Sequence, residues 1–428
     1  MKEIGVGIIG LGVVGSGVYE TLIRHSEEIA RRTGVKLAIR KAVDLDESRR
    51  DQLGVPDGIF TKNAGDAINN PSIDVVVELI GGYSPAGEFI IESLSKGKHV
   101  VTANKALLAK QGAELVALAS EKGVDLCFEA SVAGGIPILK ALREGLAANN
   151  MVGIYGIVNG TCNYVLSRMT YESMSFERAL KEAQKRGFAE ADPTLDIEGD
   201  DSAHKLAILS SIAFSTQVDL SDIYVEGITG ITHKDVEYAD ELGYVIKLLA
   251  IAKKTGNELE ARVHPALVSK DSLLASVKGE YNALLLEGDV VGTTMYYGKG
   301  AGKRPTASAI VSDLVDIGKN IRFGSPLRTR PFTYANDCKI KSIDEITSLY
   351  YIRFTALDIP GVLGHISSIL GKYEISIASV IQKAQHRGKH VPLVIMTHEA
   401  RGRDVRRALA EIDGLECIKE KSALIRIA

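Results

Sequence analysis

The chain has 428 residues, and its 45% hydrophobic and 25% charged residues are ordinary for a globular protein of about three domains. A formal net charge of −3 gives no field that favours nucleic acid or an anionic membrane as a partner, and the uncharged run 145–167 is too rich in asparagine and glycine to span a membrane. Four scattered cysteines are typical of reduced thiols, and residues 1–10 lack a signal-peptide pattern, so we expect a cytoplasmic protein.

The first motif is a glycine-rich turn between a strand and a helix. The apolar run 4–9 is followed by GLGVVG at 10–15 and by a periodic helix that ends near residue 32. Gly10 permits a tight turn, Gly12 lets the backbone approach a pyrophosphate, and Gly15 lets the helix pack closely on the strand. The cofactor-binding residues that this motif predicts are Gly10, Gly12, Val13, Val14 and Gly15. The alternatives are a plain glycine turn or a methyltransferase turn of the same geometry.

A second strand, Lys36–Val43, ends in Asp44, which bears on the choice between NAD and NADP. A carboxylate at this position accepts a hydrogen bond from a ribose 2′-OH and repels a 2′-phosphate. Basic residues at 40, 41, 49 and 50 could reverse that preference, and Asp44 lies farther from Gly15 than in the usual fingerprint. The choice stays open, and use of both cofactors is the preferred interpretation.

Strands and helices alternate through the rest of the first third of the chain. The predicted strands are 73–80, 98–102 and 124–129, and the predicted helices are 86–95 and 106–122. Repeated units of this kind predict a Rossmann-type, doubly wound parallel sheet that binds ligands at the carboxyl ends of its strands. Segments 81–83, 103–105 and 131–135 follow three of these strands, so we expect them to line one cleft.

From about residue 151 the pattern changes to mixed strands and helices, which predicts an α+β domain for substrate binding and oligomerisation. Asp200 is a plausible N-cap for a helix that runs to about residue 214. On this helix Asp201 and Lys205 share a face with apolar residues, which indicates a charged pair that points into a cleft. The alternative is an ordinary solvated pair worth about 0.3 to 0.5 kcal/mol. Glu190, Asp192 and Asp196 add further carboxylates near the lysine, which favours the cleft.

Residues 298–306 form a third candidate segment, in which glycines alternate with basic residues before a predicted helix at 307–317. Such a loop could close over the cofactor, with Gly302 as a binding residue. The alternative is a flexible connector that returns residues 300–320 to the first domain.

The C-terminal part is predicted to be a separate compact unit. Residues 325–348 are interpreted as a linker, and the strands and helices predicted over 349–428 follow the order βαββαβ of a ferredoxin-like fold. The turn Asp358–Gly361 has backbone N–H groups that could bind the carboxylate of an amino acid.

With these motifs in place, the chain resembles homoserine dehydrogenases of the long bacterial form, in which a catalytic body precedes an ACT regulatory domain. The likeness covers nearly the whole sequence. The segments that carry it are GLGVVG (10–15), VELIGG (77–82), TANKALLA (102–109), FEASVAGGIPI (128–138), GIVNGTCNY (156–164), GFAEADPTLDIEGDDSAHK (187–205), GKGAGKRPTASA (298–309), DIPGVLGHISSIL (358–370) and ISIASVIQ (375–382).

The resemblance implies reversible oxidation of L-homoserine to L-aspartate 4-semialdehyde with NADP or NAD, on the route to threonine and methionine. Lys205 matches the family's acid/base lysine, which Asp201 would position, and Lys105 matches a second lysine that touches both cofactor and substrate. Glu190 and Asp196 match residues that hold the substrate's amino group.

Two further features come from the resemblance alone. The residues that match a structural sodium site are Glu129, Val132, Gly134 and Ile136. ACT domains pair across chains, so we expect a homodimer or homotetramer that threonine inhibits. The expected domains are 1–150 for the dinucleotide, with 300–320 returning to it, 151–324 for the substrate and dimerisation, and, after the linker 325–348, residues 349–428 for regulation. The alternatives are another Rossmann-class amino-acid dehydrogenase and a non-catalytic amino-acid sensor.

Overall fold

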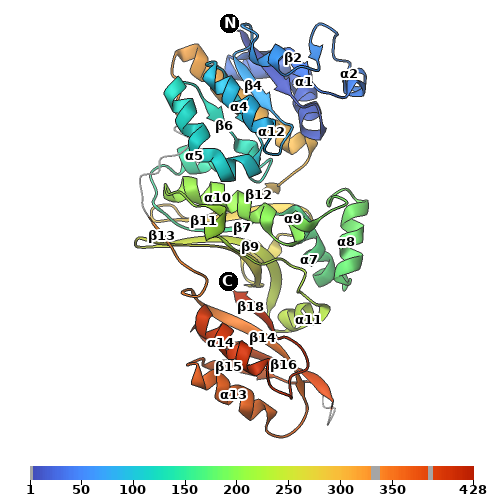
Figure 1. The fold of residues 1–428 in the computed structure, drawn as a ribbon, viewed down its shortest axis with the longest axis vertical. Coiled ribbons are helices and arrows are strands. Elements are labelled where there is room, and N and C mark those ends of the chain that lie inside the picture. The colour runs from blue at the N-terminus through green and yellow to red at the C-terminus, as the bar shows by residue number, and fades with distance from the viewer. Residues whose placement is uncertain (1–2, 329–337, 384–388) are drawn as a thin grey trace. The chain divides into compact units, whose positions relative to one another are not determined.

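The structure is a computed structural model that describes residues 3–328, 338–383 and 389–428 (Figure 1). The described chain forms two compact units, each assembled from separated stretches of sequence. The first contains the residues up to Ile154, then His204–Leu220 and the stretch from Asn282 to residue 328. The second contains Tyr155–Ala203, Ser221–Tyr281 and the described residues from Cys338 onward.

A parallel sheet organises the first unit. Its strands are β1 (Glu3–Ile9), β2 (Lys36–Val43), β3 (Phe60–Thr61), β4 (Val75–Glu78), β5 (His99–Thr102) and β6 (Leu126–Cys127). They lie in the order β3-β2-β1-β4-β5-β6, and every pair is parallel. This order reverses direction at β1, which confirms the predicted doubly wound sheet and puts its switch point beside the glycine-rich turn.

Helices from several parts of the sequence belong to this unit. They are α1 (Val13–Thr33), α2 (Glu47–Leu53), α3 (Gly65–Ile68), α4 (Ala86–Ser95), α5 (Lys105–Lys122), α6 (Ile138–Lys140) and α12 (Lys303–Phe323), and α10 (Asp200–Phe214) contributes its residues from His204 onward. The strands β11 (Tyr281–Gly288) and β12 (Gly292–Lys299) are neighbours in their sheet and lead to the start of α12.

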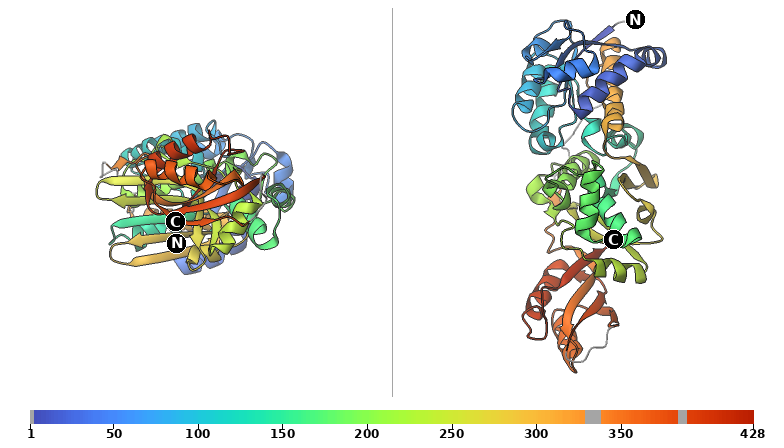
Figure 2. Two further views of the ribbon diagram at one scale, coloured as in Figure 1. Left: turned by 90° about the horizontal axis from the view of Figure 1, so that it is seen from below. Right: turned by 90° about the vertical axis from the view of Figure 1, so that its right-hand side faces the viewer.

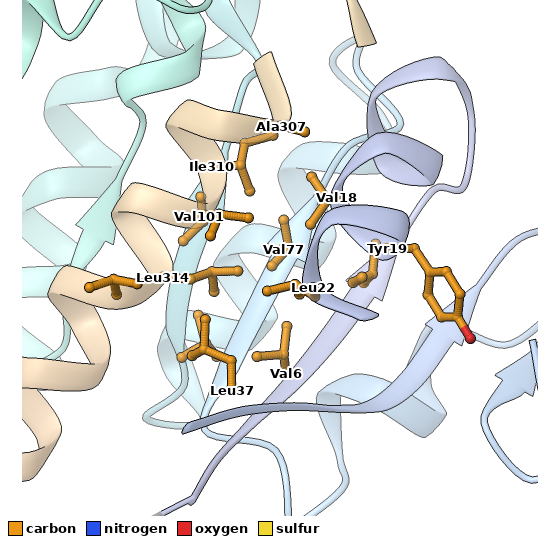
Figure 3. Packing of buried hydrophobic residues seen from close by; sticks show 14 of the residues in the cluster. Val6, Val18, Tyr19, Leu22, Leu37, Val77, Val101, Ala307, Ile310 and Leu314 are labelled. Atoms are coloured by element: carbon orange, nitrogen blue, oxygen red, sulfur yellow. The ribbon is translucent and has the colours of Figure 1, made fainter. Parts of the chain in front are cut away.

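One hydrophobic core joins α1 and α12 to the sheet, although the two helices are far apart in sequence (Figure 3). Val18 and Leu22 of α1 pack with Ile310 and Leu314 of α12 and with valines of the strands, among them Val77. Burial of these apolar side chains supplies the main stabilisation of this unit. Gly17 allows the close approach, since a Cβ there would lie 2.6 Å from the carbonyl oxygen of Lys303.

The second unit is built on a mixed sheet. Its strands are β8 (Tyr224–Val225), β9 (Tyr244–Thr255), β10 (Glu258–Ser269), β13 (Lys339–Ile340), β14 (Thr347–Leu357), β15 (Ile377–Ile381), β16 (His390–Thr397), β17 (Ala400–Arg401) and β18 (Ala423–Ile427). The main order is β9-β10-β18-β14-β16-β15. The strand β7 (Met151–Ile157) leads into Asn159 at the start of α7.

The helices of the second unit are α7 (Gly160–Glu172), α8 (Phe176–Lys185), α9 (Thr194–Ile197), α11 (His233–Glu241), α13 (Val362–Lys372) and α14 (Gly402–Ile412). From β14 onward the elements follow the predicted βαββαβ order, and α13 and α14 pack on one face of their sheet through a shared core (Figure 2). The ferredoxin-like prediction is therefore confirmed.

Several element ends differ from the sequence-based expectations. The helix α10 begins at Asp200 itself, and Gly199 takes the cap position with φ of +96° and accepts a hydrogen bond from the Ala203 N–H at 3.0 Å. Within the expected linker, β13 pairs with β10, and residues 329–337 lie outside the described chain. The last strand, β18, begins only at Ala423, and the chain still turns at Ile418, whose N–H donates to the Leu415 carbonyl.

The C-terminal βαββαβ segment shares its sheet with the strands that precede it. The strand β18 pairs with β14 on one side and, in parallel, with β10 on the other, where Ala266 lies opposite Arg426. A side-chain contact reinforces this junction, since the Arg353 guanidinium donates to both carboxylate oxygens of Asp235 at 2.7 and 3.0 Å. The segment is therefore continuous with the rest of the second unit rather than joined by a linker alone.

Candidate active site

The glycine-rich turn leaves room for a bound phosphate group. A Cβ at Gly15 would overlap the carbonyl oxygen of Gly10, and Gly10 itself has φ of +99°. The space beside Gly12 is open. Gly12 is also the N-cap of α1, and no side chain of the described residues caps that end. Backbone N–H groups at the first turn of α1 are therefore available to an anion, so the turn fits a dinucleotide.

Asp44, at the end of β2, braces this turn. One carboxylate oxygen accepts a hydrogen bond from the Leu11 N–H at 2.7 Å, and the other accepts one from the Asp46 N–H at 2.9 Å. The neighbouring arginines turn toward other acids: Arg49 lies 3.5 Å from Asp46, and Arg50 pairs with aspartates farther along the chain. Asp44 thus holds the loop that would bind the pyrophosphate, in addition to any contact with the ribose.

A polar network ties together the ends of β4 and β5. The buried Glu78 accepts hydrogen bonds from the Thr102 hydroxyl at 2.7 Å and from the N–H groups of Ile80 and Gly81. Asn104 caps α5 and donates from its side chain to the Gly82 carbonyl at 2.6 Å. Glu78 and Asn104 lie in the motifs VELIGG (77–82) and TANKALLA (102–109), but neither residue was assigned a role of its own from the sequence.

The two predicted active-site lysines lie on helices of the first unit. Lys105 is the first residue of α5 and is half-buried, and the side chain of Lys205 on α10 is only 9% exposed. The helices α5 and α10 line a common small cavity of about 30 Å³, with Leu108 and Ile208 among its walls. The structure thus places both lysines on helices that face each other.

In the second unit one amide side chain joins two carboxylates. The Nδ2 of Asn159 donates to Asp196 Oδ1 at 2.7 Å and to Asp201 Oδ2 at 2.7 Å. The Oδ1 of Asn159 caps α7 by accepting from the Cys162 N–H at 2.8 Å. Asn159 is 4% exposed and Asp201 is 8% exposed, so the pair Asp201 and Lys205 is not the solvated surface pair of the alternative interpretation.

The start of α7 also anchors the segment that carries the carboxylates. The Thr161 hydroxyl donates to the Phe188 carbonyl at 2.6 Å, and the Cys162 thiol lies 3.1 Å from the Asp196 carbonyl oxygen. The sequence NGT at 159–161 therefore fixes both ends of residues 188–196. Asn159 and Thr161 are functional candidates that the sequence analysis assigned no role, and the signal was the N-cap asparagine directly after a strand.

The other predicted carboxylates are arranged differently. Asp192 turns toward the start of α9, where it accepts from the N–H and the hydroxyl of Thr194 at 3.1 and 2.6 Å. Glu190 is exposed, and its backbone carbonyl accepts from the Gln184 side chain at 3.1 Å. The predicted group of four carboxylates therefore divides into Asp196 and Asp201, which share the partner Asn159, and two residues that are arranged separately.

The residues proposed for sodium lie in a buried turn of the first unit. The Glu129 carboxylate accepts from the N–H groups of Leu139 and Lys140 at 2.9 and 2.8 Å, so it caps α6. Val132 and Ile136 are buried, and Gly134 lies against Gly300, where a Cβ would come 2.5 Å from the carbonyl oxygen. Within the described chain there is no cluster of three or more His, Cys, Asp or Glu side chains suited to a metal ion.

Glu129 belongs to a pair of buried acids. Its N–H donates to Asp313 on α12 at 2.9 Å, and burial together with the Glu129 charge raises the pKa of Asp313 to about 8. Burial also raises the pKa of Glu129, although Arg143, 3.9 Å away, opposes that shift. Both acids therefore hold the turn in place, and Asp313 is largely protonated at neutral pH.

The loop before α12 lies beside α1. Gly302 has φ of +122° and is the N-cap of α12, and Lys303 forms an ion pair with Glu20 of α1 at 2.8 Å. The loop with Gly302 is thus held against the helix that begins at the glycine-rich turn, as a cofactor contact requires.

In the C-terminal segment a cavity of about 210 Å³ lies at the turn Asp358–Gly361. Its wall includes Gln382, whose side chain donates to Asp358 at 3.1 Å. This is the turn that the sequence predicts for binding an amino-acid carboxylate.

Among the described residues, no helix has the length and apolar character to cross a bilayer.

Two features together define a dehydrogenase that uses a nicotinamide dinucleotide. One is the Rossmann-type sheet with an open glycine turn, and the other is the buried lysine on the helix that carries a fixed aspartate. Family models agree with this class: the NAD-binding domain of homoserine dehydrogenase matches residues 10–129, homoserine dehydrogenase matches 137–315, and the ACT domain matches 350–417.

Relatives extend the match over the whole chain. Homoserine dehydrogenases of Neisseria gonorrhoeae and Pseudomonas aeruginosa are 44% and 45% identical, over 100% of this chain and 99% of each relative. The crystal structure of a homoserine dehydrogenase from Thiobacillus denitrificans has a TM-score of 0.95 and 46% identity, over 100% of this chain and 99% of that one. A hyperthermophilic archaeal homoserine dehydrogenase in complex with NADPH has a TM-score of 0.64 and 26% identity, over 74% of this chain and 98% of that one.

The chain therefore belongs to the homoserine dehydrogenase family, with a C-terminal ACT domain. It is an oxidoreductase that takes a nicotinamide cofactor.

Proposed function

We propose that this enzyme catalyses the reversible oxidation of L-homoserine to L-aspartate 4-semialdehyde, as a step toward threonine and methionine. The observation that carries the proposal is the buried Lys205 on α10, four residues after an aspartate that Asn159 holds in place. A catalytic base next to the substrate alcohol needs both a fixed position and shelter from water.

The roles of the residues follow from the chemistry of an alcohol. Lys205 takes the proton of the 4-hydroxyl as the alcohol is oxidised, and returns it in the reverse direction. The bound nicotinamide supplies the acceptor for the hydride that leaves the same carbon. Asp201 positions Lys205, and Lys105 at the start of α5 binds both cofactor and substrate.

The carboxylates select an amino-acid substrate. Asp196 and Glu190 bind the α-ammonium group, since a cation offsets the repulsion between acids on one loop. Asn159 keeps Asp196 in the required orientation through the 2.7 Å hydrogen bond.

Lys205→Ala tests the assignment of the base. We expect kcat to fall at least about 100-fold, a typical loss for a general base, while titration with NADPH shows unchanged cofactor binding. Lys185→Ala, an exposed lysine of α8, is the control and should leave both unchanged. Turnover of the Lys205 variant within about threefold of the wild type, under roughly 0.7 kcal/mol on the barrier, would contradict the role of Lys205.

Use of both NADP and NAD is part of the proposal. Asp44 opposes a 2′-phosphate, whereas Arg49 and Arg50 lie nearby and can leave their present acidic partners for a phosphate. The NADPH complex of the archaeal relative supports the capacity for the phosphorylated cofactor. Initial rates with each cofactor at matched concentrations test this point.

We further propose a structural sodium ion held by backbone carbonyls of Glu129, Val132, Gly134 and Ile136, and threonine as an inhibitor that binds at the turn Asp358–Gly361. Pairing of ACT domains would make the enzyme a homodimer or homotetramer in the cytoplasm. Rates in sodium and in potassium buffers test the sodium site. Rates with and without threonine test the inhibition, and light scattering, which gives the mass, tests the oligomeric state.

A further inference from the structure

We infer that Glu226 and Arg426 form the contact through which the ACT domain positions Asp196 and so changes substrate binding. Glu226 is thus a positioning residue, not a catalytic one. The regulatory part of this inference rests on the proposed threonine inhibition, whereas its positioning part does not.

The contact starts on the strand that joins the ACT domain to the rest of the second unit. Arg426 lies on β18, is only 3% exposed, and stacks its guanidinium over the rings of Tyr224 and Tyr350 at 5.0 and 5.8 Å. Its Nη1 approaches Glu226 Oε2 at 3.5 Å. Any shift of β18 relative to β10 therefore reaches Glu226 directly.

This ion pair is not fully formed. A charge-assisted hydrogen bond is usually 2.7 to 2.9 Å long, so a separation of 3.5 Å leaves room for the pair to tighten or open. The Nε atoms of Arg426 and Arg262 and the Nε2 of His264 have no hydrogen-bond partner among the described residues, although all three side chains are buried. A buried donor without a hydrogen-bond partner raises the free energy of the folded protein. Small changes in the position of these side chains therefore change that free energy strongly.

Close backbone contacts connect Glu226 to α9. The Glu226 N–H donates to the Val263 carbonyl of β10, and the Ile228 N–H donates to the Ile197 carbonyl, each at 2.8 Å. Between them, a Cβ at Gly227 would overlap the Ile197 carbonyl oxygen. Close packing of this kind transmits displacement instead of absorbing it.

The final step reaches the substrate carboxylate. Ile197 is the last residue of α9, and it directly follows Asp196, which Asn159 holds. A movement of the Ile197 carbonyl therefore changes the orientation of Asp196 relative to Asn159. All of these residues lie within the second unit, so the connection is continuous from β18 to the amino-group site.

The charge of Glu226 can be removed while its size is kept, in Glu226→Gln. We expect the KM for homoserine to rise about fivefold or more with kcat within threefold, and the threonine concentration for half-inhibition to rise at least tenfold, about 1.4 kcal/mol of coupling. Calorimetry should show threonine binding within threefold of the wild type. Glu420→Gln is the matched control, because Glu420 is an exposed ACT-domain acid that bonds to Thr355.

A second variant guards against a folding defect. Arg426→Met should reproduce the KM shift, and adding Glu226→Gln to it should change nothing further, since residues of one contact are not additive. Homoserine KM in Glu226→Gln equal to that of Glu420→Gln, or additive effects in the double variant, would overturn the inference. If the wild type neither binds nor responds to threonine, the proposed regulation fails, and the KM comparison still decides whether Glu226 positions Asp196.

Discussion

The glycine-rich turn, proposed to bind the cofactor, and the carboxylate loop (residues 188–196), proposed to bind the substrate, are held in different ways. Around Gly10 and Gly15 the shape comes from backbone packed too closely for any side chain. Around Asp196 and Asp201 side-chain hydrogen bonds hold the chain, and the Asn159 amide joins the two carboxylates. An added Cβ at Gly10 or Gly15 would therefore disturb the first site, whereas the second should be sensitive to loss of the amide donor.

The largest effect is expected from Asn159→Asp. The new carboxylate still caps α7 by accepting from Cys162, but it cannot donate to Asp196 and Asp201, and it adds a third negative charge. We expect kcat/KM for homoserine to fall about 100-fold, close to 3 kcal/mol, with cofactor affinity unchanged.

The control for this variant is Ser175→Asp, which places a new charge at another capped helix start, that of α8. Steady-state rates of both variants separate the local role of Asn159 from the general effect of charge. Equal losses in the two variants would show that the Asn159 amide is not what holds the loop.

The glycines of the turn should differ from each other. Gly12→Ala meets no neighbouring atom and has φ of −59°, so thermal unfolding should stay within about 1 °C while the KM for the cofactor rises about tenfold. Gly15→Ala should lower both stability and cofactor affinity, because its Cβ would overlap Gly10. A stable Gly15→Ala enzyme with normal cofactor KM would refute the packing argument.

Much of this contrast was predictable from the sequence. Gly10 to Gly15, the parallel sheet and the βαββαβ order follow from local patterns, since glycine spacing and hydrophobic period reflect the backbone alone. The grouping of Asp196 with Asp201 depends on Asn159, which lies far away in sequence, whereas Asp192 bonds to Thr194, only two residues farther along the chain. No local pattern encodes which distant donor a carboxylate will find.

Asp44→Asn tests how the Asp44 carboxylate, which holds the glycine-rich turn, affects the choice between NADP and NAD. The amide oxygen can still accept from Leu11, but the negative charge is gone, so the preference for NADP over NAD should rise about fivefold to tenfold in kcat/KM. The ratio of the two kcat/KM values is the measurement. An unchanged ratio would show that Asp44 acts on the loop alone.

Smaller effects concern stability and pH in the first unit. The pKa of Asp313 is raised to about 8 in the folded protein, so the folded state binds more protons than the unfolded state between about pH 4 and 8. Stability is therefore lost as pH rises through this range. Asp313→Asn should remove the loss, and its melting temperature should exceed that of the wild type by a few degrees at pH 8 but not at pH 5.

The second unit should show the opposite trend. Lys247 of β9 donates to Asn163 Oδ1 at 3.0 Å and to the Val277 carbonyl, and burial lowers its pKa to about 8. The unfolded state binds more protons between about pH 8 and 10.5, so stability contributed by this group rises over that range. From pH 8 to 10, the melting temperature of the wild type should therefore rise relative to that of Lys247→Met. A constant difference between the two melting temperatures would contradict the lowered pKa of Lys247.

The pairing of β18 with β10 has a consequence for protein engineering. An ACT domain is often regarded as a module that can be cut away or transplanted, yet here its terminal strand completes a sheet of the neighbouring domain. Excision would uncover the edge of β10 at Ala266 and Leu267, which pair with Arg426 and Ile427. A chimera that exchanges regulatory domains should therefore carry its own matching partner strand across the graft.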